Sequence, residues 1–349
     1  MKNQVYLTLA DGSVWKGYGE LSQPVEGEVV FTTSSGGYPQ VLTDPSYCGQ
    51  IIVFAFPPTG IYGVDTERLE GQNAWASAAL CSMVDETQDG RFQHLSTWMK
   101  EKETPLLGGF DTRHLILTLR KNGSIMGRID TEPALPKTQT FDTNYIPLVS
   151  CKEKEVFGDG DVAIGVVDFG VKENLIRTLL SKNCKVIKFP HSVKAEEIIK
   201  SGVKGLILSG GPGNPDELPE GVELVKSLIG KIPYMGIGLG CAFLALACGA
   251  SIYKMNFGHR GAKPVIDVVT EHGFQSSQNH QFSIVEESLK NTPLMLSFRN
   301  LADNTIEGIR HKATFACGVL FDPDASPGPE ESVFILERFI ERVRSGEVA

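Results

Sequence analysis

The second half of the chain alternates apolar runs with amphipathic stretches, and this rhythm restricts the possible folds more than any other feature. Four apolar runs predict buried strands, at residues 162–167, 184–189, 205–208 and 234–237. An amphipathic stretch that predicts a helix follows each of them, at residues 173–181, 195–201, 221–229 and 242–248. Strands separated by helices at this spacing pair in parallel, and right-handed crossovers bring the loops after the strands to one edge of the sheet. We therefore predict an α/β domain over residues 161–349, with a doubly wound, mostly parallel sheet and helices on both faces.

The first part of the chain has a different pattern and predicts a separate domain over residues 1–131. Short β-type runs are separated by glycine and proline turns, at residues 5–9, 27–33 and 50–56. Two stretches with a helical pattern follow, at residues 95–102 and 113–121. These elements predict a mixed β/α domain built around a sheet. Residues 132–160 are polar, contain prolines and show no sustained period, so they predict a linker.

Charge and cysteine usage exclude several classes of function. The net charge is −9, which argues against binding to nucleic acid or to an anionic membrane surface. No apolar run approaches the roughly 20 residues that span a bilayer, and the N-terminus lacks the pattern of a signal peptide. The seven cysteines are scattered without C-x-x-C spacing, which indicates reduced thiols and no zinc site. We therefore expect a cytoplasmic protein with no metal, no cofactor and neither a nucleic-acid nor a membrane partner.

A glycine-rich turn between the fourth predicted strand and its helix has the form of a nucleophile elbow. Residues 236–240 read Gly-Ile-Gly-Leu-Gly, a pattern that raises a Ser or Cys side chain over a helix N-terminus for attack on a carbonyl group. The presented residue here is Gly238, which has no side chain. Cys241 lies in the first turn of the helix, where a free cysteine is more often a packed apolar side chain than a nucleophile. A catalytic Cys241 is kept as the alternative, because a helix N-terminus lowers the pKa of a thiol.

Three further pairs of residues lie in loops of this half of the chain: Gly211 and Gly213, Asp322 and Asp324, and His259 and His280. The glycine pair predicts either an oxyanion hole or anion nest, or a plain Gly-Pro turn. The aspartate pair suits acid–base chemistry or half a metal site, but we favour residues that cap a local turn. The histidines have no nucleophile to activate, so we interpret each as a structural residue.

These loops, in this order, resemble those of the class I (triad-type) glutamine amidotransferases and, more narrowly, of the small subunit of carbamoyl phosphate synthetase. In the first half the resemblance rests on four segments, Glu28–Phe31, Gly37–Tyr38, Leu42–Tyr47 and Asp111–Arg113. In the second half it rests on five, Asp168–Lys172, Ser209–Gly213, Lys254–His259, Gln278–His280 and Ala325–Pro329. The resemblance runs nearly from end to end, and it implies that subunit's own N-terminal domain followed by a class I amidotransferase-like domain.

Members of that family hydrolyse glutamine with a Cys–His–Glu triad, and the released ammonia travels to a large ATP-using subunit. The cysteine attacks the side-chain amide, the histidine moves the proton and the glutamate orients the histidine. Carried over to this sequence, the three positions are Gly238, Asp322 and Asp324, and none has the required residue type. A carboxylic acid titrates at about pH 4 and does not replace an imidazole poised near neutral pH. The resemblance therefore implies a degenerate triad, and we predict no glutaminase activity.

The glutamine pocket of the family is matched only in part. Six positions match residues that line it, Ser46, Gly211, Gly213, Leu239, Asn279 and Phe282. Three positions depart from it, Cys241, Ala242 and Gln281. The side chain of Gln281 replaces a family glycine and would occupy space that the glutamine carboxamide needs. We expect glutamine or another small metabolite to bind weakly or not at all.

Three hypotheses of function follow. The first is a catalytically inactive homologue, a pseudoenzyme that contacts a carbamoyl phosphate synthetase-like large subunit through its N-terminal domain and stabilises, regulates or targets it within a heteromer. The second is an amidotransferase or hydrolase with rewired chemistry, at Cys241 or at the Asp322 and Asp324 pair. The third is a stand-alone sensor that binds a metabolite in the old glutamine pocket. The pathway is left open between pyrimidine biosynthesis, arginine biosynthesis and a specialised route.

Overall fold

The computed structural model describes residues 3–85, 90–138 and 145–346, and it divides into two compact units, Met1–Asp142 and Thr143–Ala349. The division falls within residues 132–160, which the sequence predicts as a linker. The end of that segment is nevertheless structured, because it forms helix α4 (Ile146–Val149) and strand β8 (Glu155–Phe157). Strand β8 joins the sheet of the second unit, and a three-residue strand is too short to leave a period in the sequence. The domain limits of 1–131 and 161–349 stay predictions.

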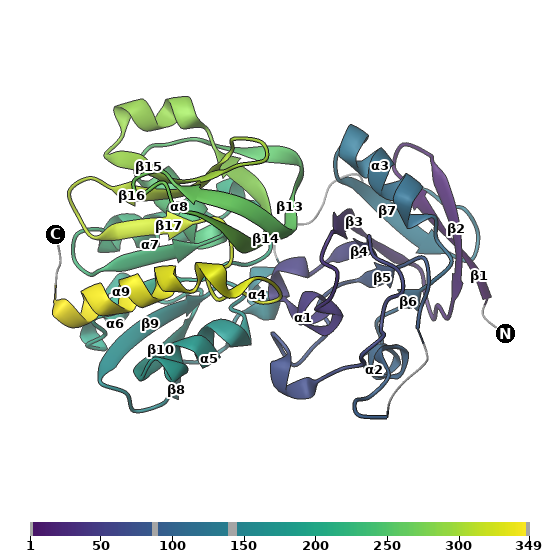
Figure 1. Cartoon of the computed structure of the whole chain (residues 1–349), viewed down its shortest axis with the longest axis horizontal. Helices are drawn as coiled ribbons and strands as arrows, with labels where there is room; N and C mark the ends of the chain where they lie inside the picture. Colours follow the sequence, from purple (N-terminus) through teal and green to yellow (C-terminus); the bar gives the residue numbers. More distant parts are fainter. Residues whose placement is uncertain (1–2, 86–89, 139–144, 347–349) are drawn as a thin grey trace. The chain divides into compact units, whose positions relative to one another are not determined.

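A seven-stranded mixed sheet forms the first unit, in the order β2-β1-β7-β3-β4-β5-β6 (Figure 1). Its strands are β1 (Asn3–Leu9), β2 (Val14–Gly19), β3 (Val25–Thr32), β4 (Gln50–Phe54), β5 (Ala78–Leu80), β6 (Leu106–Leu107) and β7 (Ile125–Asp130). The described helices are α1 (Tyr38–Thr43), η1 (Pro45–Tyr47), η2 (Thr66–Arg68), α2 (Leu95–Glu101) and α3 (Thr112–Asn122). Strands β3 to β6 run parallel, whereas β1, β2 and β7 pair antiparallel. Helices α1 and α2 bury Leu42 and Trp98 against Ile52 of the sheet, so the predicted mixed β/α domain is confirmed.

The second unit contains a ten-stranded sheet in the order β14-β13-β15-β16-β17-β12-β11-β9-β10-β8. Its remaining strands are β9 (Val162–Asp168), β10 (Cys184–Pro190), β11 (Gly205–Leu208), β12 (Tyr234–Ile237), β13 (Ile252–Asp267), β14 (Gly273–Ile284), β15 (Leu294–Asn300), β16 (Ile306–His311) and β17 (Ala316–Val319). The strands β10, β9, β11, β12 and β17 are parallel. They include the four strands that the sequence rhythm predicts, which lie side by side between β17 and the edge strand β8.

Helices cover both faces of this parallel region. Besides α4, the described helices of the second unit are α5 (Glu173–Ser181), α6 (Ala195–Lys200), η3 (Pro215–Glu217), α7 (Pro219–Leu228), α8 (Leu239–Ala247), η4 (Glu286–Asn291), η5 (Glu330–Ser332) and α9 (Phe334–Ser345). One core contains side chains of α6, α7 and α8, and a second contains side chains of α5 and α9 (Figure 1). Neighbouring strand residues alternate between the two, as Leu206 faces the first core and Ile207 the second. The predicted doubly wound architecture is confirmed.

The antiparallel strands β13 to β16 extend the sheet in a way that the sequence rhythm does not predict. Long strands β13 and β14 form a hairpin with a β-bulge between Lys254 and His259. Strand β14 buries polar residues such as Ser276, Gln278 and His280, so its sequence lacks the apolar alternation that identifies a strand. Among the described residues, none of the helices combines the length and the apolar character that crossing a membrane requires.

Candidate functional site

The predicted elbow is present, and Gly238 forms its tip. Gly238 follows β12 and precedes the first turn of α8, with φ 52° and ψ −108°. Its N–H donates to the carbonyl of Val319 at 2.8 Å, and its own carbonyl accepts the N–H groups of Cys241 and Ala242, both at 3.1 Å. A residue with a side chain is strained at this positive φ, whereas glycine adopts it freely.

The glycines on either side of the tip are required by close backbone contacts, but the tip itself has free space. A Cβ atom on Gly236 would lie 2.3 Å from the carbonyl oxygen of Gly240, and one on Gly240 would lie 2.3 Å from that of Leu208. At Gly238 the nearest atom to such a Cβ is Gly210 Cα, at 3.4 Å, which is an ordinary contact. The fold therefore keeps the narrow elbow and has space at its tip for a Cβ atom that the sequence does not supply.

Cys241 does not offer a substitute nucleophile. Its side chain is fully buried in the core beneath α8, and its Sγ packs so closely against β17 that a Cβ on Gly318 would lie 2.8 Å away. Burial raises the pKa of this thiol well above its usual range. A protonated, inaccessible thiol is not nucleophilic, so its surroundings are those of a packed apolar side chain. Ala242, the next departure from the family pocket, is also buried.

Asp322 and Asp324 meet a lysine from a distant loop. Lys172 Nζ lies 3.2 Å from Asp322 Oδ2 and 3.1 Å from Asp324 Oδ1, and it donates to the carbonyl of Ser326 at 2.6 Å. The Asp324 side chain is only 1 % exposed and that of Lys172 only 8 %. The preferred interpretation, local turn capping, is therefore incomplete: the carboxylates belong to a buried ion pair. No local sequence pattern points to Lys172 as their partner, because the contact joins loops about 150 residues apart along the chain.

The loops predicted to share one edge of the sheet are brought together. The elbow tip lies beside Gly210, and Asn174 Nδ2 donates to the carbonyl of Asp324 at 2.7 Å. The N–H of Asp322 donates to the carbonyl of Ser277 on β14 at 2.9 Å. Gly211 approaches the loop after β9 so closely that a Cβ on it would lie 2.0 Å from the carbonyl oxygen of Phe169. Gly213 lies in the same loop as Gly211, at a positive φ of 113°.

The other pocket positions are divided between the two units. Leu239 begins α8, and both Asn279 and Phe282 lie on β14, whereas Ser46 belongs to η1 of the first unit. The side chain of Gln281 is buried against β13, where its Nε2 donates to the carbonyl of Met255 at 2.8 Å and its Oε1 accepts from Arg260 Nη2 at 2.9 Å. These bonds hold the Gln281 amide at the β-bulge. Their effect on a bound glutamine stays a prediction.

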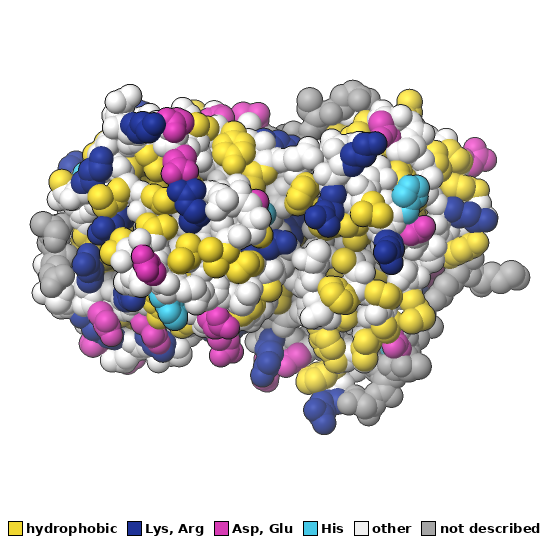
Figure 2. Space-filling model, turned by 45° about the horizontal axis from the view of Figure 1, so that its top comes forward, with side chains coloured by type: hydrophobic (Ala, Val, Ile, Leu, Met, Phe, Trp, Pro, Cys, Tyr) yellow, Lys and Arg dark blue, Asp and Glu magenta, His cyan; other side chains and the backbone are white. Residues whose placement is uncertain are grey.

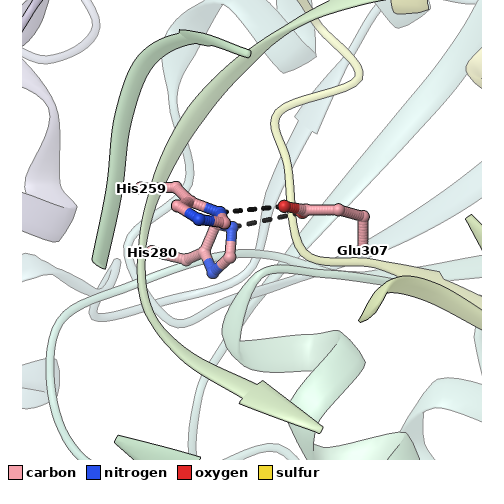
Figure 3. Close-up of side chains that lie close together, drawn as sticks. All are labelled: His259, His280 and Glu307. Carbon is pink, nitrogen blue, oxygen red and sulfur yellow. Dashed lines mark hydrogen bonds and ion pairs between the residues drawn. The ribbon is translucent and has the colours of Figure 1, made fainter. Parts of the chain in front are cut away.

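A second polar cluster, which the sequence analysis missed, joins three strands of the antiparallel region. His259 on β13 and His280 on β14 both face Glu307 on β16 (Figure 3). The Nδ1 atom of His259 lies 2.9 Å from Glu307 Oε1, and the Nε2 atom of His280 lies 3.2 Å from Glu307 Oε2. The sequence analysis interpreted each histidine singly as a structural residue and did not predict that the two are direct partners across the hairpin. A prediction of the β13–β14 hairpin would have placed His259 and His280 opposite each other.

Electrostatics within this cluster are strong because Glu307 is completely buried. Burial alone raises the pKa of the Glu307 carboxyl, but His280 and His259 outweigh it and lower the pKa to about 2. Burial lowers the pKa of His259, yet hydrogen bonds and charge from Glu307 and Asp303 raise it overall. A buried carboxylate is stable only with such compensation. The cluster therefore concentrates charged groups in a buried place, and it is separate from the elbow and its chemistry.

The whole chain is similar to known proteins. Residues 7–129 match the model of the carbamoyl-phosphate synthase small chain, CPSase domain, and residues 165–342 match the model of glutamine amidotransferase class-I. The chain is 39% identical to the carbamoyl phosphate synthase pyrimidine-specific small chain of Halalkalibacterium halodurans, over 99% of this chain and 98% of the relative. It is 38% identical to the carbamoyl phosphate synthase small chain of Bacillus cereus, over 99% and 97%. Among solved structures, a glutamine amidotransferase of Thermotoga maritima aligns with a TM-score of 0.39 at 18% identity, covering 54% of this chain and 86% of that one.

Proposed function

Because the chain belongs to the carbamoyl phosphate synthase small-chain family, we propose that it binds a synthetase large subunit without hydrolysing glutamine. The observation that carries this proposal is Gly238 at the tip of an intact elbow. Amide hydrolysis by a triad begins with attack from a side chain at that position. Without the nucleophile, only the small residual rate enhancement from substrate binding and oxyanion donors is left.

The neighbouring groups give no other route to the same chemistry. Cys241 is buried and its pKa is raised. Asp322 and Asp324 are held by the Lys172 ammonium, and a carboxylate in a buried ion pair is a structural group whose charge is already compensated. These contacts argue against the hydrolase with rewired chemistry. The metabolite sensor has no specific observation in its favour.

A role in binding draws support from the surface of the first unit. Figure 2 shows hydrophobic side chains gathered on its visible face. Phe56, Ile61 and Tyr62 follow strand β4 and are 45–49% exposed. Tyr62 is held in place, because its hydroxyl accepts the N–H groups of Gly37 and Tyr38 and its ring stacks on that of Tyr38. Grouped apolar side chains on a fixed surface are typical of protein interfaces. We assign segment 56–62 to contact with the large subunit.

Glutaminase turnover tests the proposal directly. The purified chain is assayed for ammonia release from glutamine, alone and with a carbamoyl phosphate synthetase large subunit. We expect no ammonia above a buffer blank in either case, and no saturable heat when millimolar glutamine is titrated into the chain. The complex should still make carbamoyl phosphate from added ammonium salts.

Two variants make the assay decisive. The triple variant Gly238→Cys/Asp322→His/Asp324→Glu is the positive comparison, since it restores the residue types of the family triad. Wild-type ammonia release above the blank would overturn the proposal, and its loss in Cys241→Ser would then assign the activity to that thiol. Failure of the chain to bind any large subunit would reject the proposed partner while leaving the absence of glutaminase activity intact.

A further inference from the structure

Three side chains of metal-binding type converge inside the antiparallel region of the second unit. The ligand atoms of His259, His280 and Glu307 all lie within 4.8 Å of one another. The two histidines are 5% and 8% exposed, and Glu307 is 0% exposed. They come from strands β13, β14 and β16, so the site joins residues that are distant along the chain (Figure 3). None of these residues takes part in the elbow.

Outer hydrogen bonds fix which ring nitrogen of each histidine points inward. Nδ1 of His280 lies 2.8 Å from the carbonyl oxygen of Phe282, and Nε2 of His259 lies 2.7 Å from Asp303 Oδ2. Both oxygens only accept, so each of these ring nitrogens carries a proton. The opposite nitrogens, Nδ1 of His259 and Nε2 of His280, therefore face Glu307. Glu307 and the Gln278 amide oxygen also accept, so the inner ring nitrogens carry protons that a metal ion would displace on binding. The Asn300 side-chain nitrogen Nδ2 lies 3.4 Å from His259 Nδ1.

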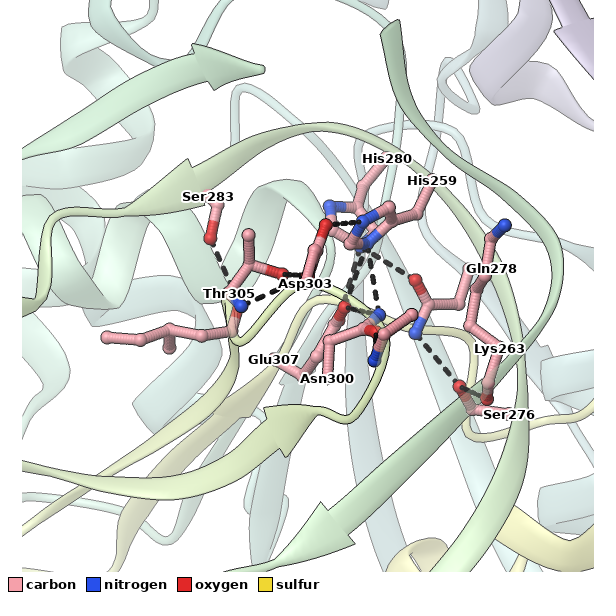
Figure 4. Close-up of polar contacts among 12 residues, drawn as sticks. His259, Lys263, Ser276, Gln278, His280, Ser283, Asn300, Asp303, Thr305 and Glu307 are labelled. Atoms are coloured by element: carbon pink, nitrogen blue, oxygen red, sulfur yellow. Dashed lines mark hydrogen bonds and ion pairs between the residues drawn. The ribbon is translucent and has the colours of Figure 1, made fainter. Parts of the chain in front are cut away.

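Oxygen atoms that only accept gather around the inner ring nitrogens of the cluster. Glu307 Oε1 accepts from Asn300 Nδ2 at 2.8 Å. The other oxygen, Oε2, is buried and makes no well-aligned hydrogen bond among the described residues, and it forms an ion pair with His280 Nε2 at 3.2 Å. The Gln278 side-chain oxygen lies 3.1 Å from His280 Nε2, and the Gln278 amide nitrogen is turned outward to donate to Ser276 Oγ at 2.9 Å (Figure 4). Two ring nitrogens, a carboxylate and an amide oxygen thus share one buried space, and a metal ion that displaces the inner ring protons would bind all four groups.

The spacing of these atoms suits a small transition-metal ion. Donors around a tetrahedral zinc ion with bonds of about 2.0–2.1 Å lie about 3.3 Å apart. The distances here are 2.9 Å for His259 to Glu307, 3.2 Å for His280 to Glu307 and 3.1 Å for His280 to Gln278. Imidazole and carboxylate are ligands that zinc and its neighbours in the first transition row share. An outer N–H that is held by a carboxylate or a backbone carbonyl is typical of metal-bound histidine.

We propose that His259, His280 and Glu307 bind a divalent transition-metal ion of the zinc type, with Gln278 as a fourth oxygen donor. Asp303 orients His259 from outside, and Thr305 in turn donates to the second oxygen of Asp303. The ion ties β13, β14 and β16 together next to Asn279 and Gln281. This revises the expectation of no metal, which rested on the cysteine pattern alone. The site is independent of glutamine chemistry and stands whether or not the proposed function is correct.

Zinc binding by the intact chain tests this site. The full-length protein is treated with a chelator and dialysed, its metal content is measured by mass spectrometry, and zinc chloride is then titrated by calorimetry. We expect one equivalent of zinc per chain and a higher Tm with zinc than without it. Cobalt should give visible absorption bands of a site with nitrogen and oxygen ligands. No saturable binding and no change in Tm would overturn the proposal and leave a proton as the bridging cation.

Three variants separate this site from adventitious binding. Glu307→Gln keeps the shape of a ligand but removes its charge, so zinc affinity should fall by at least about tenfold. Asp303→Asn alters only a half-exposed group outside the site, so the test stays valid even if Glu307→Gln does not fold. This variant should weaken zinc binding by about 10–100-fold. His272→Gln, at the exposed hairpin turn, is the matched control and should bind like the wild type. Equal affinity in all four proteins would mean an adventitious ion only.

Discussion

At the scale of single residues, the glycines of the elbow are of two kinds. Some are required by the backbone, whereas Gly238 occupies the position where the reaction requires a nucleophile. Gly236 and Gly240 have no space for a side chain, whereas Gly238 has the space but not the conformation for one. The first two are needed by the fold. Gly238 is not required by space, but a glycine adopts its backbone conformation with the least strain, whereas a nucleophile with a side chain would be strained there.

Alanine substitutions distinguish these two kinds of glycine. Gly238→Ala forces a Cβ onto a residue at φ 52°, so it should lower the free energy of unfolding by about 1–3 kcal/mol. Gly236→Ala should cost more, since its Cβ would collide with the Gly240 carbonyl at 2.3 Å. Chemical denaturation of both variants beside the wild type measures the difference. Equal losses would show that space and not backbone strain limits position 238.

The buried ion pair at Lys172 gives a second prediction at this scale. Lys172→Met removes the ammonium between Asp322 and Asp324 and leaves two carboxylates without it, which should cost about 3–5 kcal/mol of unfolding free energy. The matched control is Lys182→Met. Its ion pair with Glu337 is on the surface, so its loss should cost only about 0–1 kcal/mol. Similar losses in the two variants would contradict the interpretation of the Lys172 contacts as a buried pair.

At the scale of elements, the sequence predicted best where one period describes a whole element. Strands β11 and β12 and helix α5 begin and end at the predicted residues, because each buries one continuous apolar pattern. Strand β14 was missed, since most of its buried positions are polar, and His280 among them is paired with the distant Glu307. The candidate site followed the same division. The elbow could be recognised as a local sequence motif. The roles of Lys172 and of the histidine cluster could not, because they depend on contacts between residues that are distant along the chain.

Strands β3 and β7 of the first unit carry a charge pair that predicts acid sensitivity. Arg128 on β7 lies 2.8 Å from Glu26 on the adjacent strand β3 and 2.7 Å from Asp130. Hydrogen bonds from Arg128 lower the pKa of Asp130. Burial raises the pKa of Glu26, but hydrogen bonds from the Lys137 backbone and from Arg128 lower it overall.

The sign of the effect follows from these lowered values. A carboxyl whose pKa is lower in the folded state stabilises the fold above its ordinary pKa, and this stability is lost as the pH falls. We expect the Tm of the wild type to fall more steeply than that of Arg128→Met between about pH 5 and pH 3. Thermal unfolding across this range checks it. Parallel curves for the two proteins would mean that the pair contributes nothing to acid sensitivity.

At the scale of the whole molecule, the proposed role depends on a surface and not on a catalytic centre. The matched pair Ile61→Glu and Ile199→Glu tests that surface, because the two isoleucines are 49% and 48% exposed but belong to different units. Ile61→Glu should weaken binding to a large subunit by at least about tenfold. Ile199→Glu should bind like the wild type. Equal binding of both variants in calorimetric titrations would place the contact elsewhere on the chain.

The free space at Gly238 also bears on how far this chain stands from an active relative in evolution. In the genetic code, glycine can become cysteine, and aspartate can become histidine or glutamate, each by one nucleotide change. The elbow backbone has neither closed over the tip nor filled the position, so the fold opposes the first of these changes only through the strain of a side chain at φ 52°. A second barrier lies at Lys172, whose ammonium is matched to two aspartates and would be poorly matched to a histidine at position 322. A lineage returning to catalysis would therefore pass through a destabilised intermediate unless the lysine changed its contacts at the same time.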